Sequence, residues 1–272
     1  MPFCPYTGLD FLACPAPKIL RRFRTCPLTA MSPHPSPSNP LPLTPLAPDL
    51  WSAQQRISVQ GLPLRTRMTV ARLAGNQLWL HSPVAPTPQL RAALDTLGNV
   101  AWVVAPNRMH HLYAGDWLPF YPQAQLWGAP GLASKRHDLL QLQTLPPQLN
   151  DATTPLAWHS QLQMQCMGGI PLLNECVWLH QPSGSLIVTD VLQYYPQDLS
   201  LSARLFNSLN GTRSRLAMPR AVRFAIRDKA AARAAAQVIC NWPVQRIVLA
   251  HDTVIEQHAA GQLRAALGFL LD

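Results

Sequence analysis

Three apolar segments, each ending in polar or ionisable side chains, constrain the fold of this 272-residue chain more than any other feature. They read VAWVVAP before Asn107 and His110, SLIVTD up to Asp190, and RIVLAHD up to His251 and Asp252. Short continuous apolar runs bounded by turn residues are typical of strands buried on both faces. Because open α/β sheets bind ligands outside the carboxyl ends of their strands, these polar ends predict a binding site.

The segments between these runs predict an α/β fold. TPQLRAALDTLG has the signals of a helix that begins after Thr87 and stops at Gly98, with an apolar strand on either side. This order indicates a strand–helix–strand step with a buried sheet. Turn residues at 74–76 and 182–184 separate β-rich runs and predict two hairpins. DKAAARAAAQVICNW and TVIEQHAAGQLRAALGFLL predict two further helices near the C-terminus.

The first 48 residues differ in composition from the rest. They contain twelve of the 28 prolines and include the tract MSPHPSPSNPLPLTPLAP. Proline fixes φ and lacks an N–H donor, so this tract predicts neither a helix nor the interior of a sheet. We expect a disordered leader over 1–48 and a single folded domain over 49–272. Met31 opens the Pro/Ser tract and is an alternative start of the chain.

The composition of the chain limits the classes of partner molecule that we expect it to bind. Hydrophobic residues make up 48% of the chain and charged residues only 13%, which is enough apolar material for a sizeable core. No apolar run is long enough to span a bilayer, so we expect no membrane partner. The net charge of +9 permits nucleic-acid binding, but the basic residues are spread thinly and we do not expect it. Six cysteines without a C-x-x-C pair indicate reduced thiols in a cytoplasmic protein.

The polar strand ends supply a set of candidate metal ligands. His110, His111, Asp190 and His251 offer neutral imidazole and carboxylate, which suit zinc, iron or manganese. Each residue also has an ordinary alternative. A carboxylate after a strand is often a turn former or a helix cap, and a lone histidine is often a hydrogen-bonded structural residue. Composition alone leaves both interpretations open.

The segments VVAPNRMHH, LIVTD and IVLAHD resemble the metallo-β-lactamase fold superfamily. The resemblance covers about residues 50–272 and is strongest to an uncharacterised branch described as a domain of unknown function. It implies a four-layer αβ/βα sandwich with the metal in a cleft between the sheet edges. In the superfamily an H-x-H-x-D-H motif follows the first strand, and a bridging aspartate and a last histidine end two later strands.

The superfamily motif is degenerate in this chain. Pro106 and Arg108 stand where its first two histidines would be, His110 takes the aspartate position and His111 the final histidine position. Glu175 stands about where the middle histidine would be. These losses remove the first of two metal sites. The resemblance therefore implies one divalent metal, with zinc as the first choice and iron or manganese as alternatives.

The resemblance implies a mononuclear metal-dependent hydrolase that acts through a metal-bound water. His110, His111, Asp190 and His251 would hold the metal, and Glu175 would be a general base or an extra ligand. The residues expected to support or line the cleft are Asn107, also a helix cap, Arg108, His81 and Asp252. The alternative is a non-catalytic metal- or ligand-binding module. The sequence leaves the substrate and the oligomeric state open.

Overall fold

The computed structural model of the chain describes residues 43–59, 62–146, 158, 160–196, 200–251 and 253–272. These residues belong to one compact unit, Pro35–Asp272. The predicted leader lies outside the described residues up to residue 42, and Met31 lies there too. Thr44–Ala47, however, forms strand β1. The structured part of the chain therefore begins earlier than the boundary predicted at residue 48.

The first sheet has seven strands in the order β1-β2-β3-β4-β5-β6-β7. Pairing is antiparallel from β1 to β4 and parallel from β4 to β7. The β3–β4 connection is the hairpin predicted at 74–76, and Gly75 takes a positive φ of 71° there. The strands are β1 Thr44–Ala47, β2 Leu50–Val59, β3 Leu62–Leu73, β4 Gln77–His81, β5 Asn99–Ala105, β6 Gln125–Gly128 and β7 Gln143–Thr144.

The second sheet has five strands in the order β12-β11-β10-β9-β8. Only β10 and β11 are parallel. The β9–β10 connection is the hairpin predicted at 182–184. The strands are β8 Leu162–Cys166, β9 Cys176–His180, β10 Ser185–Val188, β11 Arg246–Leu249 and β12 Val254–Ile255.

Two of the cysteines form a disulfide across the second sheet. Cys166 and Cys176 are register partners on β8 and β9 and are bonded to each other. The predicted reduced state is therefore wrong for this pair. Cys240 is a free, buried thiol, as expected.

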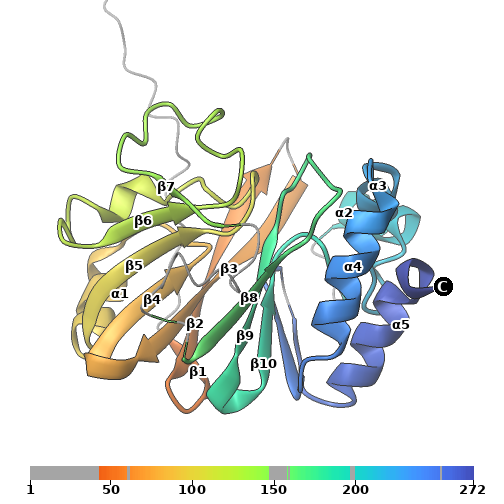
Figure 1. Cartoon of the computed structure of the whole chain (residues 1–272). Coiled ribbons are helices and arrows are strands. Elements are labelled where there is room, and N and C mark those ends of the chain that lie inside the picture. Colours follow the sequence, from red (N-terminus) through yellow and green to blue (C-terminus); the bar gives the residue numbers. More distant parts are fainter. Residues whose placement is uncertain (1–42, 60–61, 147–157, 159, 197–199, 252) are drawn as a thin grey trace, which may run out of the picture. The chain divides into compact units, whose positions relative to one another are not determined.

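Helices cover the outer faces of both sheets (Figure 1). Leu90 and Leu94 of α1 pack on the first sheet, and α4 and α5 pack on the second. Helix α1 begins as predicted, because the Thr87 side chain accepts the Leu90 N–H at 3.3 Å, but it ends at Asp95, before Gly98. The helices are α1 Pro88–Asp95, α2 Leu201–Asn210, α3 Arg220–Phe224, α4 Lys229–Cys240 and α5 Ala259–Leu271.

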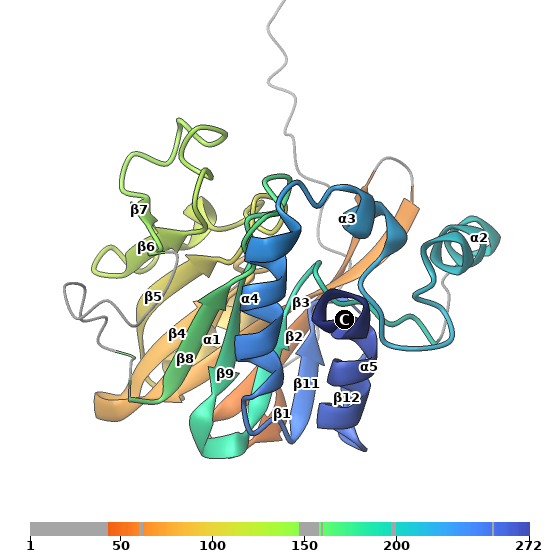
Figure 2. The ribbon, with the colours of Figure 1, turned by 45° about the vertical axis from the view of Figure 1, so that its right-hand side comes forward.

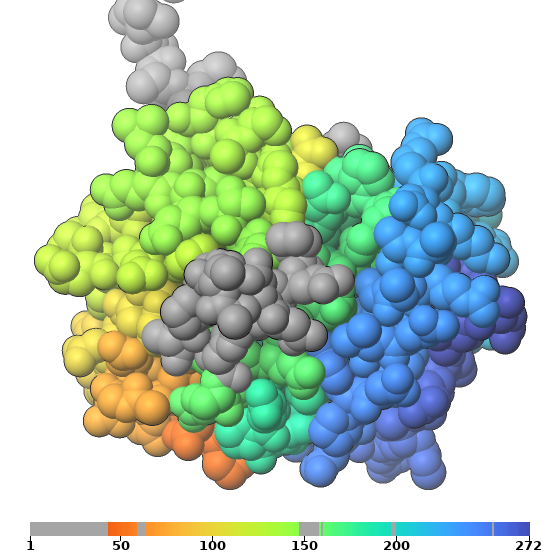
Figure 3. Space-filling model, viewed as in Figure 1, coloured from red at the N-terminus to blue at the C-terminus, as the bar shows by residue number. Residues whose placement is uncertain are grey.

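A tryptophan-rich core joins the two sheets face to face. Trp79 meets Trp178 edge-on with ring centroids 5.0 Å apart, and Trp158 bridges Trp102 and Trp127 at 5.4 and 5.7 Å. Helix, sheet, sheet and helix thus form four layers, which confirms the predicted architecture (Figure 2). The space-filling view places the C-terminal helices and the β6–β7 region on opposite flanks (Figure 3). Within the described part of the chain, no helix has the length and apolar character that crossing a bilayer requires.

Candidate metal centre

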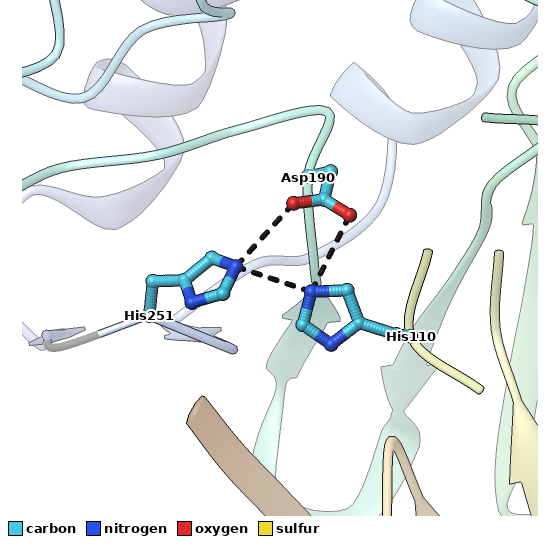
Figure 4. Close-up of side chains that lie close together, drawn as sticks. All are labelled: His110, Asp190 and His251. Carbon is cyan, nitrogen blue, oxygen red and sulfur yellow. Dashed lines mark hydrogen bonds and ion pairs between the residues drawn. The ribbon is translucent and has the colours of Figure 1, made fainter. Parts of the chain in front are cut away.

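Three strand ends from the two sheets meet at one place. The parallel strands β10 and β11 end side by side, which brings Asp190 and His251 to the same edge of the second sheet. Strand β5 of the first sheet ends at Ala105, and the turn that follows it carries His110. The three side chains point toward one another in Figure 4. The structure therefore brings together three of the four predicted ligands.

The three side chains form a tight triangle. His110 Nε2 lies 3.1 Å from His251 Nε2 and 3.3 Å from Asp190 Oδ2. His251 Nε2 lies 3.3 Å from Asp190 Oδ1, so each imidazole faces a different carboxylate oxygen. The side chains of His110, Asp190 and His251 are only 8%, 14% and 7% exposed. Their donor atoms are thus close together and largely shielded from solvent.

The second nitrogen of each imidazole ring is held by another group. His251 Nδ1 donates to the Arg65 carbonyl at 2.8 Å, so in the neutral ring Nε2 carries the lone pair. His110 Nδ1 is 2.7 Å from the Ser82 hydroxyl. Ser82 directly follows β4 and has a strained backbone conformation with a positive φ of 53°. Metal-binding histidines are usually oriented by such partners. Both Nε2 atoms are therefore directed at Asp190.

Electrostatic interactions between Asp190 and the two histidines stabilise the triangle. Burial raises the pKa of Asp190, but the charges and hydrogen bonds of His110 and His251 outweigh it and hold that pKa well below its usual value. Burial lowers the pKa of His251, but the Asp190 carboxylate and the Arg65 carbonyl outweigh it and raise that pKa. Asp190 is thus an ionised carboxylate across the physiological pH range, as a metal ligand must be.

The donor set fits a small divalent cation. A tetrahedral zinc site with metal–ligand bonds of about 2.0–2.1 Å places its ligand atoms about 3.3–3.4 Å apart. The three closest donor separations here are 3.1, 3.3 and 3.3 Å, and the candidate ligand atoms all lie within 4.8 Å of one another. Two imidazoles and one carboxylate suit zinc, iron or manganese.

Asn107 organises the turn that carries His110. Its Oδ1 accepts the backbone N–H groups of Met109 and His110, both at 2.7 Å, as a helix cap would, but residues 107–114 form a turn and not the predicted helix. Its Nδ2 lies 2.8 Å from Asp190 Oδ2 and 2.8 Å from Thr189 Oγ1. One fully buried amide therefore fixes the end of β5 against the end of β10.

Glu175 supports the site from behind and does not enter it. Its Oε1 accepts the Thr189 N–H at 2.7 Å, and its Oε2 accepts the N–H groups of Asp190 and Val191 at 2.7 and 3.0 Å. The side chain is 0% exposed, and its burial followed by the Asp190 charge raises the Glu175 pKa. Both oxygens are engaged by the backbone that positions Asp190. This corrects the expectation of a general base or an extra ligand.

His111 is not part of the triangle. Arg136 Nη1 donates to His111 Nδ1 at 2.9 Å and also to the His111 backbone carbonyl at 2.9 Å. Burial, with the charges of Lys135 and Arg136, lowers the His111 pKa to about 4. Of the four residues predicted as ligands, the structure groups only His110, Asp190 and His251.

Of the other residues that were predicted to support or line the cleft, Arg108 and His81 lie outside the triangle. Arg108 Nη1 donates to the Pro171 carbonyl at 2.8 Å, outside the cavity beside the triangle. His81 is buried against Trp79, and burial followed by the charge of His110 lowers its pKa to about 3. Within the described residues its Nε2 has no hydrogen-bond partner. Asp252 lies outside the described residues.

Two residues of the site were not predicted. Ser82 follows the apolar strand β4, and that strand-end position is the same signal that indicated the other site residues. Arg136 lies 25 positions beyond His111, in a region without a sequence pattern, so nothing in the sequence indicates their contact.

A cavity of about 360 Å³ opens beside the triangle. Its apolar walls come from the β2–β3 hairpin and from the segment after β5. Among the described residues that line it, Asp190 is the only carboxylate, and none is lysine or arginine. The apolar lining residues are Ile57, Leu64, Pro83, Met109 and Leu112.

Solved structures with the metallo-β-lactamase fold are similar to this chain. A metallo-β-lactamase from Erythrobacter litoralis is 14% identical with a TM-score of 0.57, over 84% of this chain and 96% of that one. The mono-zinc form of FIM-1 from Pseudomonas aeruginosa is 12% identical with a TM-score of 0.57, over 85% and 96%. The Flv1 flavodiiron core from Synechocystis is 12% identical with a TM-score of 0.58, over 84% of this chain and 60% of that one. The chain therefore has the metallo-β-lactamase fold.

The family is defined by a separate match. Residues 48–210 match the family described as a domain of unknown function, DUF4336, and this is more than half of the chain. The chain belongs to that family, which confirms the resemblance to an uncharacterised branch. No curated protein matches the chain.

Proposed function

We propose that the protein is a metal-dependent hydrolase with one divalent metal ion, held by His110, Asp190 and His251. The observation that supports this most is the triangle of donor atoms, with separations of 3.1–3.3 Å. Zinc is the first choice, with iron or manganese as alternatives. His111, which the sequence placed among the ligands, is left out of the proposed site because no ring nitrogen of it lies in the group of donor atoms that His110, Asp190 and His251 form, and its Nδ1 accepts from Arg136 Nη1.

The protein's own groups prepare the site for this chemistry. When bound, the cation would act as a Lewis acid on a carbonyl or phosphoryl oxygen and lower the pKa of a coordinated water. The Arg65 carbonyl and the Ser82 hydroxyl keep the His251 and His110 rings aimed at one point. Asn107 and Glu175 keep the Asp190 carboxylate in place. Such preorganisation avoids a reorganisation cost during the reaction.

The lining of the cavity favours an uncharged substrate. Its walls are mostly apolar, and none of the described lining residues is a lysine or arginine that would pair with an anionic group. Apart from the proposed metal ion and the histidines of the site, a substrate carboxylate or phosphate buried there would meet no cationic side chain among the described lining residues. We therefore propose a neutral carboxylic ester or lactone with an apolar body, in preference to a phosphoester or a β-lactam.

One observation favours the non-catalytic alternative. Glu175 is fully engaged, and no carboxylate other than Asp190 lies among the described residues of the cavity. A module that binds a metal or ligand without turnover needs no such general base.

The cytoplasmic location indicated by the sequence stays a prediction. The Cys166–Cys176 disulfide does not favour it, since disulfides are uncommon in reducing compartments.

Metal-dependent turnover by the full chain tests the proposal. The purified protein is stripped with a chelator, reloaded with zinc, iron(II) or manganese, and assayed on neutral esters, lactones, a phosphodiester and a β-lactam. We expect turnover of neutral esters or lactones only in the loaded protein, and none in Asp190→Asn. Stoichiometric metal binding without turnover of any class would favour the non-catalytic alternative. Absence of metal binding would refute the site.

A further inference from the structure

Helix α2 presents its apolar side chains to solvent and its polar ones to the protein. It buries Ala203, Asn207 and Asn210, whereas Leu201, Leu205 and Leu209 are 82%, 63% and 62% exposed. A helix that packs on a domain core has the opposite pattern. The exposed leucines are spaced four residues apart and therefore form one stripe along the helix. Phe206, 48% exposed, lies next to it.

Polar contacts attach α2 to the domain and leave this stripe unused. Asn210 Oδ1 accepts the Ala221 N–H at 3.2 Å, which ties the end of α2 to α3. Arg220 Nη1 donates to the Leu209 carbonyl at 3.1 Å, and the Ser200 side chain caps the first turn by accepting the Ala203 N–H. Helix α2 stands at the margin of the molecule, apart from α4 and α5 (Figure 2). The leucine stripe therefore stays largely exposed among the described residues.

The region around the stripe is strongly basic. Residues 200–227 contain six arginines and no aspartate or glutamate, although the whole chain has 13 acidic residues. Four of these arginines are exposed, including one on α2 itself: Arg204, Arg215, Arg220 and Arg227. An exposed aliphatic stripe thus lies within a segment of uniform positive charge.

We propose that α2 binds the surface of an anionic lipid bilayer. A helix with an apolar face and basic flanks lies in the plane of the membrane, with its leucines below the headgroups and its arginines at the phosphates. A second copy of this chain is a poorer partner, because an isologous contact would bring the same arginines together. The proposal concerns peripheral binding and differs from the expectation that no membrane is a partner.

Vesicle binding by the full chain tests this proposal. The protein is sedimented with phosphatidylcholine vesicles and with vesicles of phosphatidylcholine and phosphatidylglycerol in equal parts. We expect binding to the anionic vesicles only, weakened by added salt. Leu205→Ser with Leu209→Ser should reduce the partition coefficient at least about tenfold, since two apolar side chains no longer leave water. Arg204→Glu with Arg215→Glu should reduce it as well.

A matched control separates the stripe from exposed leucines in general. Leu140, 93% exposed on a different segment, is replaced by serine and should leave vesicle binding unchanged. All variants should keep the wild-type thermal unfolding midpoint, because the replaced side chains are exposed. Equal binding to both vesicle types, or no binding to either, would overturn the proposal. So would a dimer in solution that the paired leucine substitutions dissolve, which would identify a second copy as the occupant.

Discussion

Two adjacent histidines provide the sharpest test of the metal centre. His110→Ala removes a ring whose Nε2 lies 3.1 and 3.3 Å from the other two donors. His111→Ala removes a ring whose Nδ1 is occupied by Arg136, at 2.9 Å. The two substitutions delete the same atoms at neighbouring positions. We predict that His110→Ala abolishes metal binding and that His111→Ala preserves it.

The size of the difference can be bounded. Changing a residue that only orients a metal ligand typically weakens metal binding about 10- to 100-fold. Loss of one of three ligands should exceed this, so we expect the Kd of His110→Ala to rise more than about 100-fold, or about 2.7 kcal/mol. His111→Ala should change the Kd less than about threefold. Ser82→Ala removes the partner of His110 Nδ1, so its Kd for the metal should lie between the values of His110→Ala and His111→Ala.

Competition against a chromophoric zinc chelator measures these affinities, and elemental analysis gives the metal content of each purified variant. Chemical unfolding of the metal-free variants checks that both retain the fold. Equal losses of affinity in both variants would restore His111 to the ligand set. Unchanged affinity in His110→Ala would show that the triangle is a hydrogen-bonded cluster and not a metal site.

Three further outcomes follow from the same contacts. Glu175→Ala leaves three buried backbone N–H groups without an acceptor, so its unfolding free energy should fall by about 3 kcal/mol or more in urea titrations, with a smaller loss for Glu175→Gln. In the metal-free protein, the raised His251 pKa contributes stability that is present below its ordinary value of 6.5 and is lost as the pH rises through the raised value. The lowered Asp190 pKa acts oppositely, since its contribution is present above the ordinary value and is lost as the pH falls through the lowered value. Asp190→Asn removes the carboxylate that raises the His251 pKa, so the unfolding midpoint of this variant should lose much of its decline above pH 6.5. Arg136→Ala removes a cation and a donor beside His111, so NMR titration should show the His111 pKa rising from about 4.

The strand ends were predictable from sequence because one physical rule governs them. Buried strands need continuous apolar side chains, and polar residues at their carboxyl ends collect at a sheet edge. The runs before His110, Asp190 and His251 follow this rule, and the structure brings these side chains together. The four-layer architecture followed from the resemblance, whereas the alternation of strands and helices alone predicted only an α/β fold.

The direction of each side chain was not predictable in the same way. His110 and His111 lie in an irregular turn, where no periodicity assigns neighbouring residues to one face or the other. His111 differs from His110 in its contact with Arg136, a residue that lies 25 positions later in the sequence. Glu175 likewise contacts backbone 14–16 positions later, which no local pattern shows. The surface role proposed for α2 depends on which face the fold buries, and that too is a tertiary property.

Pro106 and Arg108 connect the end of β5 to the second sheet. The Pro106 carbonyl accepts the Cys176 N–H at 2.9 Å, and the Arg108 N–H donates to the Leu173 carbonyl at 2.9 Å. Arg108 also reaches the Pro171 carbonyl through its side chain. The end of β5 is thus bonded directly to the segment that leads into β9 of the other sheet. Because these bonds span the two sheets directly beside the turn that carries His110, they fix the position of that turn relative to the second sheet, on which Asp190 and His251 lie.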